Sequence, residues 1–383
     1  MAETAEQTYL PLFDDLPEAR TGVWPAQWIK GAAERGVILA EEKIQPEQIQ
    51  PASLDLRLGS HAYLVPASFM PGLKWSVEDK LRAFSSEKIN LEDGAVLVTG
   101  KVYIVPLQEQ LRLKKRMSAV ANPKSSTGRL DVFARVITDG GNEFDSIRER
   151  YVGRLWLEIA PRSFNVKVRT GSRLAQVRLK TGTPAPSGAS VKRLHEKVGL
   201  VDDKESQADV KGAAIALSVD IVGDSDTGII GYKAKQNSDF IDVDLINHYD
   251  RADFWETVYK PDSGGIILKT DDFHILATKE SLNVPPDFAA DMVAYDTLVG
   301  EFRAHYAGFF DPGFGYSEGK PVGAKIVLEV RSHEVPFLVE HGQIVGRVVY
   351  ERLSVETDKP YGAGIGSSYQ GQGLALGKQF KSK

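Results

Sequence analysis

Two stretches of this chain repeat one pattern at a fixed separation. The letters L-W-L-E-I surround Glu158 and the letters I-V-L-E-V surround Glu329, so the two glutamates lie 171 residues apart. A glycine turn follows each stretch, and Gly171 and Gly342 keep the same separation. Unrelated strands have no reason to share one offset through both a glutamate and a turn, so the pattern indicates an internal duplication. The fold must therefore be one that two copies of a unit can build in tandem.

The repeated unit has the pattern of short β-strands. Apolar and polar residues alternate in Ser53–Gly59, which Leu217–Gly223 echoes, and again from Val102 onward. A period of two is typical of half-buried strands, and turn residues separate the runs. One helix is predicted over Trp24–Gly36, with Gly36 as its stop. The sequence thus predicts a mainly β fold, a barrel or sandwich in each copy, with a few short helices.

Length and composition set the domain boundaries. A chain of 383 residues is too long for one ordinary core, and 42% hydrophobic with 26% charged residues is typical of globular proteins. We expect an N-terminal tail over 1–21 and a first domain over 22–185. A connection over 186–212, containing Pro, Gly, Ser and then charged residues, leads to a second domain over 213–383.

The residue types that are missing restrict the chemistry. The chain has no cysteine, which excludes disulfides and the cysteine-containing zinc site of zinc deaminases. Its seven histidines include no pair with H-x-x-x-H spacing, so we expect no metal ligands from the protein, no zinc, and Mg²⁺ as the only ion. A net charge of −5 argues against nucleic acid as a partner. We find no long apolar run and no secretory signal, and therefore expect no membrane segment and a cytoplasmic location.

The first candidate site is the segment N-P-K-S-S-T-G-R. Lys124, Ser125, Ser126 and Arg129 can present two cations, two hydroxyls and backbone N–H groups to one phosphate chain. The planar fork of an arginine suits phosphate oxygens. The alternative is a polar helix N-terminus, because Pro-x-Ser-Ser often begins a helical turn.

The second candidate is the glutamate in each repeated strand, Glu158 and Glu329. Alternation lets one polar residue of a half-buried strand face a cleft while its neighbours face the core. Burial raises the pKa of a carboxyl group, which suits a proton carrier near neutral pH. The alternative is an exposed strand glutamate opposite a lysine.

The third candidate is Ala307–Gly315, A-G-F-F-D-P-G-F-G. Asp311 begins an Asp-Pro-Gly turn, and Phe310 with the flanking glycines predicts a hairpin whose backbone can approach a flat ring. The alternative is an ordinary tight hairpin.

The fourth candidate is the glycine-rich run Tyr361–Gly373, which also contains Tyr369 and Gln372. So many glycines exclude a regular helix or strand, and the aromatic residues are unusual in an inert linker. The run predicts a lid that orders over a ligand; the alternative is a disordered tail.

These elements, in this order, resemble the dCTP deaminases and more loosely the trimeric dUTPases of the same superfamily. The resemblance covers most of the chain and includes the opening strand P-A-S-L-D-L-R-L-G, the serine motif, the glutamate strand, the hairpin and the tail. Two departures stand out: Lys124 replaces the first arginine of the family's R-S-S-x-x-R, and a serine in the tail replaces the usual lysine. The resemblance implies a dUTPase-like (β-clip) distorted barrel for each copy, in the long duplicated form found in some bacteria.

Each copy lacks motifs that the other keeps. The first copy has the serine motif but no Asp-Pro-Gly hairpin and no glycine-rich run; the second has both of these but reads D-T-L-V-G-E at 296–301. We therefore expect the first copy to supply Lys124, Ser125, Ser126 and Arg129, and the second to supply Glu329, the hairpin and the lid. Sites of this superfamily lie between subunits, so the resemblance implies a homo-oligomer with threefold character; whether the halves meet within one chain or between chains stays open.

The resemblance implies hydrolytic deamination of dCTP to dUTP, with Mg²⁺ accompanying the triphosphate. In this interpretation Glu329, Ser125 and Arg129 are catalytic, and Glu158 is a relic, a structural carboxylate or part of a second site. The expected substrate-binding residues are Lys124, Ser126, Ala307, Phe310, Asp311, Tyr361, Tyr369 and Gln372. A dUTPase, a bifunctional deaminase–dUTPase and an inactive nucleotide-binding regulator remain alternatives, and inhibition by dTTP stays an open question.

Overall fold

The computed structural model describes residues 20–184, 187–202, 210–211, 213–262, 264–293, 302–304, 308–332, 335–362 and 373–381. Most of the described residues with regular secondary structure lie in strands, which confirms the predicted mainly β class. The helices in these ranges are α1 (Ala26–Glu34), η1 (Pro46–Gln48), α2 (Val77–Phe84), α3 (Ser125–Gly128), α4 (Gly188–Val198) and α5 (Arg251–Phe254). No helix in this part of the chain has the length and apolar character needed to cross a bilayer.

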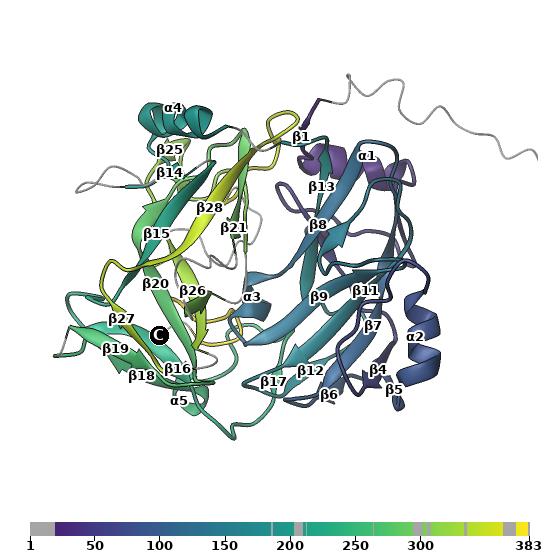
Figure 1. Ribbon diagram of the computed structural model, residues 1–383, viewed down its shortest axis with the longest axis horizontal. Helices are drawn as coiled ribbons and strands as arrows, with labels where there is room; N and C mark the ends of the chain where they lie inside the picture. Colours follow the sequence, from purple (N-terminus) through teal and green to yellow (C-terminus); the bar gives the residue numbers. More distant parts are fainter. Residues whose placement is uncertain are drawn as a thin grey trace, which may run out of the picture.

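The strands fall into two bodies that stand side by side, with α3 between them (Figure 1). Those of the first body are β1 (Gly22–Val23), β2 (Ile38–Ala40), β3 (Leu54–Leu56), β4 (His61–Val65), β5 (Glu87–Asn90), β6 (Ala95–Leu97), β7 (Val102–Arg112), β8 (Met117–Pro123), β9 (Val132–Thr138), β10 (Ser146–Ile147), β11 (Val152–Pro161), β12 (Val166–Val168) and β13 (Ala175–Thr181). Those that follow are β14 (Val210–Lys211), β15 (Ala214–Asp220), β16 (Ile229–Ala234), β17 (Ile241–Asp242), β18 (Trp255–Tyr259), β19 (Gly265–Leu268), β20 (Phe273–Leu282), β21 (Phe288–Val293), β22 (Phe302–Ala304), β23 (Phe309–Phe310), β24 (Tyr316–Ser317), β25 (Lys320–Pro321), β26 (Ala324–Ser332), β27 (Phe337–Glu340) and β28 (Ile344–Arg352).

Strand pairing repeats with the offset seen in the sequence. β11 pairs with β7 so that Glu158 lies opposite Ile104, and β26 pairs with β20 so that Glu329 lies opposite Ile275. The pairs β13–β8 and β28–β21 correspond in the same way, as do β12–β6 and β27–β19. The two copies therefore share one topology as well as one sequence pattern.

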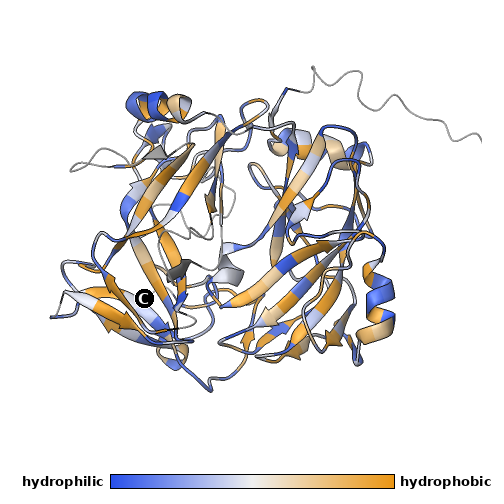
Figure 2. Cartoon of the chain, viewed as in Figure 1, coloured by the Kyte–Doolittle hydropathy of each residue, from blue (hydrophilic) through white to orange (hydrophobic). Residues whose placement is uncertain are grey.

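The two copies share a continuous core. Apolar residues alternate with polar ones along the strands (Figure 2). The buried apolar residues form a cluster that contains Leu157 and Ile159 of the first copy with Ile275 and Val327 of the second. β17 also adds in parallel to the edge of β12, which joins the two copies through main-chain hydrogen bonds. The apolar contact fixes how the copies sit, so residues on either side of it keep a defined spacing.

The end of the chain packs across this junction. Residues 374–380, called the C-terminal anchor below, place Phe380 against the rings of Phe254 and Trp255, with centroid distances of 5.7 and 5.9 Å. Backbone N–H groups of His248 and Tyr249 donate to the Gln379 carbonyl at 2.8 and 3.0 Å. The anchor thus joins the core cluster of the first copy, although in sequence it follows the second.

Candidate functional site

The serine motif lies at the start of α3, directly after β8. Lys124 occupies the N-cap position and no side chain caps the helix, so the serines are not used as helix caps. The Thr127 hydroxyl donates to the Leu174 carbonyl at 2.8 Å and fixes α3 to the chain before β13. Ser126 is buried at 6% exposure. The motif does begin a helical turn, as the alternative expects, but no side chain caps that turn.

The catalytic glutamate expected in the second copy meets the serine motif of the first. Glu329 on β26 is 6% exposed, and its Oε1 lies 4.0 Å from Nε of Arg129, which follows α3. Burial raises the pKa of the Glu329 carboxyl to about 7, and the nearby Arg129 charge opposes part of this rise. A carboxyl with that pKa can take up and release a proton at neutral pH.

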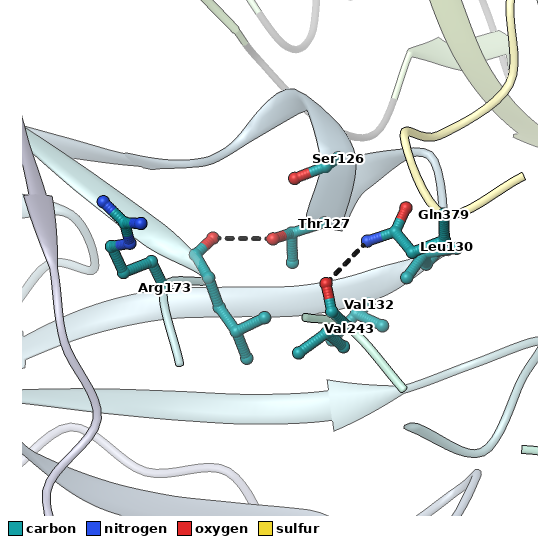
Figure 3. A pocket seen from close by; sticks show the side chains of 8 residues that line it. Ser126, Thr127, Leu130, Val132, Arg173, Val243 and Gln379 are labelled. Carbon is teal, nitrogen blue, oxygen red and sulfur yellow. Dashed lines mark hydrogen bonds between the residues drawn. The ribbon is translucent and has the colours of Figure 1, made fainter. Parts of the chain in front are cut away.

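Arg129 is held from its other side by the C-terminal anchor. Its Nη1 donates to the carbonyls of Ala375 and Leu376, each at 3.2 Å. A narrow gap beside α3, open to solvent in part, is bordered by Ser126 and by Gln379 of the anchor (Figure 3). It has no room for a water molecule, far less than a ligand pocket provides, so it is a packing gap beneath the motif.

The hairpin of the second copy also reaches the first copy. Asp311 lies just after β23, and its Oδ1 is 3.5 Å from Nη2 of Arg178 on β13. Burial raises the pKa of Asp311 to about 6, whereas the neighbouring Arg178 and Lys124 cations lower it. The same carboxyl is also influenced by Asp55 and Asp291, which raise its pKa further. Asp311 and the serine motif therefore share one electrostatic environment.

Two cations of the first copy meet at a buried carboxylate beside the motif. Asp55 is 2% exposed, forms an ion pair with Lys124, and lies 3.7 Å from Arg173. Burial lowers the pKa of Lys378 in the C-terminal anchor, where the Lys124 and Arg173 charges lower it further and the Asp244 and Asp55 carboxylates oppose part of this fall. Lys124 and Arg173 are cations that a bound anion, such as a phosphate chain, can recruit.

Glu158, the equivalent glutamate of the first copy, has a different environment. It is fully buried and forms an ion pair with Arg135, which lies directly opposite on β9. The guanidinium of Arg135 also stacks on the Phe144 ring at 4.0 Å. Glu158 is thus neutralised by its own copy, in an arrangement that Glu329 lacks.

Of the other predicted binding residues, Phe310 and Tyr361 lie at the hairpin of the second copy. The Phe310 side chain belongs to the core of the second copy and packs on Phe314 at 5.3 Å, which leaves its backbone for contacts. Tyr361 also packs on Phe314, at 5.6 Å, and its N–H donates to the Pro312 carbonyl at 2.7 Å. The start of the glycine-rich run is thus attached to the hairpin. Ala307, Tyr369 and Gln372 lie outside the described residues.

Sequence reasoning did not single out the charged residues that line this junction. Those that matter here are Asp55, Arg173, Arg178, Asp291 and Lys378. Asp55 and Arg178 each occupy a polar position in an alternating strand, where a charged side chain is expected to face solvent, so the sequence carries no signal that singles them out. The partners of Arg178 could not be foreseen, because Asp291 and Asp311 belong to the other copy.

Comparisons with known proteins agree with this arrangement. Residues 20–183 match the family model "2'-deoxycytidine 5'-triphosphate deaminase (DCD) N-terminal domain", and residues 187–380 match the model of its C-terminal domain. A crystal structure of 2'-deoxycytidine 5'-triphosphate deaminase from Agrobacterium tumefaciens is 50% identical, with a TM-score of 0.83, and the match covers 87% of this chain and 99% of that one.

Curated relatives match over shorter stretches. A "dCTP deaminase, dUMP-forming" of Beutenbergia cavernae is 32% identical over 110 residues, which are 28% of this chain and 53% of the relative, so the chain spans about half of that protein's length. A protein of the same name from Salinispora arenicola is 25% identical over 188 residues, 45% of this chain and 90% of the relative. Two family models in the order of the two copies, together with the close structural match, lead to one conclusion. The chain belongs to the 2'-deoxycytidine 5'-triphosphate deaminase family.

Proposed function

We propose that this chain hydrolyses dCTP to dUTP and ammonia, with Glu329 as the general acid and base. The observation that carries the proposal is the position of Glu329: a buried carboxyl whose pKa is raised to about 7, beside Arg129 of the serine motif. A proton carrier is most effective when its pKa lies near the working pH. The family assignment gives the substrate, and the names of the curated relatives agree with it.

In the proposed reaction Glu329 takes a proton from a water molecule and transfers it to N3 of the cytosine ring. The hydroxide adds to C4. Glu329 then takes the proton of the new C4 hydroxyl and passes it to the amino group, so the C4–N bond breaks, ammonia leaves, and a C4 carbonyl remains beside the protonated N3. Ser125 and backbone carbonyls of the hairpin, near Ala307, hold the water. General acid–base catalysis contributes typically about 10²–10⁴-fold, so positioning and preorganised charge must supply the rest.

The phosphate chain is assigned to the cationic side of the site. Lys124, Ser126 and Arg173 lie around the start of α3, where two of them share the Asp55 carboxylate. A triphosphate would exchange part of this internal pairing for contacts to its own oxygens. Mg²⁺ enters with the triphosphate as part of the substrate, without contact to the reacting carbon.

The test is a direct assay of the purified chain with dCTP and Mg²⁺. Ammonia release is followed while the nucleotide products are resolved, and Glu329→Gln is measured beside the wild type. We expect ammonia and dUTP from the wild type and a loss of at least 10²-fold in the variant, since the carboxyl carries the proton. Binding of dCTP without ammonia would overturn the enzyme assignment and leave a nucleotide-binding regulator.

A second activity, hydrolysis of dUTP to dUMP, is favoured by the "dUMP-forming" names of several relatives. In this chain the Asp311 carboxyl, with a pKa raised to about 6, is the candidate base for water attack on phosphorus. The same assay decides the point. Pyrophosphate and dUMP formed in step with ammonia, and lost in Asp311→Asn, would make the chain bifunctional; dUTP as the final nucleotide would exclude it.

A further inference from the structure

One arginine of the first copy holds the hairpin of the second. The Arg178 side chain on β13 is fully buried and forms an ion pair with Asp291 on β21. Its Nη1 also donates to the Ala290 carbonyl at 3.3 Å, and its Nη2 to the Phe310 carbonyl at 3.4 Å. The guanidinium carbon lies 4.0 Å from the centroid of the Phe309 ring. With Asp311 at 3.5 Å, this single group contacts every residue from Phe309 to Asp311.

The fold itself does not require an arginine at this position. The equivalent position of the second copy, 171 residues later, is Val349 on β28. An apolar side chain therefore occupies this position in the equivalent strand. Burying a guanidinium is costly unless several groups accept its hydrogen bonds, and apolar residues of similar volume often stabilise an interface as well. The arginine is therefore explained by the geometry it imposes on the hairpin rather than by stability.

We propose that Arg178 is a positioning residue, which sets the hairpin and the Asp311 carboxyl in register with the serine motif. β13 lies next to β8, which leads directly into Lys124, so Arg178 and the motif are fixed to adjacent strands. The proposal rests on the proposed function, because it takes the hairpin as the element that contacts the pyrimidine nucleoside.

The charged groups facing Asp311 make the proposal testable. They are Arg178 from β13, Lys124 after β8, Asp55 in β3 and Asp291 in β21. The two cations lower the pKa of Asp311 and the two carboxylates raise it. Loss of the Arg178 charge must therefore raise this pKa, and loss of the Asp291 charge must lower it. These opposite shifts check that the two charges face Asp311, and the fall in kcat/KM tests whether Arg178 positions the hairpin.

The experiment measures kcat and KM for dCTP in the wild type, Arg178→Met, Arg178→Lys and Asp291→Asn. It also measures dCTP affinity against pH for each of them in a Glu329→Gln background, which removes the ionisation of Glu329. We expect kcat/KM to fall by at least 100-fold in Arg178→Met. Arg178→Lys should recover only part of the loss. Its ammonium restores the positive charge but cannot bridge two carboxylates and stack on a ring.

The affinity profile gives the second readout. We expect a midpoint near pH 6 that moves up in Arg178→Met and less in Arg178→Lys, which keeps a positive charge. It should move down in Asp291→Asn and disappear in Asp311→Asn, which separates it from ionisation of the phosphates. Should Arg178→Met fail to fold, Arg178→Lys and Asp291→Asn carry the test.

Two contrary results have different meanings. A wild type that turns over dCTP, with Arg178 variants within threefold of it and with unmoved midpoints, would overturn the positioning role alone. A wild type that neither binds nor deaminates dCTP would remove the proposed function, and the role of Arg178 with it.

Discussion

The carboxyl groups of this chain differ mainly in what surrounds them. Glu158 and Glu329 occupy equivalent strand positions, yet Glu158 is paired with Arg135 of its own copy, whereas Arg129 approaches Glu329 only to 4.0 Å. The close ion pair within its own copy gives Glu158 a structural role. A buried carboxyl with a more distant cation keeps a raised pKa, here about 7, and remains able to exchange protons.

This raised pKa has a consequence for stability. The pKa of Glu329 is about 7 in the folded chain against 4.5 as its ordinary value, so between these pH values the folded chain keeps a proton that the unfolded chain has released. Stability then falls as the pH rises through this window, by on the order of 3 kcal/mol. Glu329→Gln should therefore be more stable than the wild type at pH 8, with little difference at pH 4, as measured by urea unfolding.

Glu158→Gln provides the matched control. It removes the buried partner of an ion pair whose Arg135 side chain is 34% exposed, so the cost is smaller than the about 3–5 kcal/mol typical of a fully buried pair. We expect this variant to be less stable than the wild type at pH 8. If both substitutions change stability in the same direction at pH 8, the contrast between the two glutamates is wrong.

Among the elements, the C-terminal anchor has the most unexpected position. It ends the chain, yet it packs into the core cluster of the first copy and holds Arg129 through two carbonyl groups. The glycine-rich run is therefore bounded by fixed points, Tyr361 on the hairpin and the anchor beside α3. Both of these points belong to the proposed site.

Loosening the anchor should disturb catalysis more than folding. Phe380→Ala removes a ring that is 5% exposed, and such a change in a core costs typically about 3–5 kcal/mol. At a chain end, this cost can be met by local release of the anchor rather than by global unfolding. Arg129 then loses its carbonyl partners and its place beside Glu329. We expect kcat/KM to fall at least tenfold and the acid limb of the kcat profile to move to higher pH.

Lys381→Ala is the control for this prediction. Lys381 follows the anchor, its side chain is 49% exposed, and it pairs only with the exposed Asp250 at the surface. We expect this variant to keep the activity and pH profile of the wild type. Equal losses in the two variants would mean that the terminus matters in some way other than by holding Arg129.

At the scale of the whole molecule, the residues proposed for one site come from both copies of the duplicated fold. The contacts between Arg129 and Glu329 and between Arg178 and Asp311 lie within one chain. The continuous core and the β12–β17 pairing hold the two copies in the orientation that these contacts need. We therefore predict that each chain brings its own halves of the site together.

A mixing experiment tests this arrangement. Ser125→Ala and Glu329→Gln each disable one half of the proposed site. The two variants are unfolded, mixed and refolded together, and we expect the mixture to stay as inactive as either variant alone. The reason is that each chain pairs its own halves, and neither contains an intact set. Ammonia release from the mixture well above the sum of its parts would show that the halves meet between chains.

Much of this organisation can be predicted from the sequence, because periodicity and spacing are local properties of the chain. The strand pattern, the helix at α1, the duplication at one offset and the complementary loss of motifs all follow from residue order. So does the assignment of the serine motif and Glu329 to one site, once each copy is seen to lack what the other has.

The tertiary structure alone decided what surrounds each group. Nothing local distinguishes Glu158 from Glu329, since the difference depends on whether an arginine lies across the neighbouring strand. The roles of Arg178 and of the C-terminal anchor depend on contacts between residues more than 100 positions apart, as from Arg178 to Asp291 or from Arg129 to Leu376. Burial and charge act through space, so the pKa of a carboxyl is set only when the two copies have packed together.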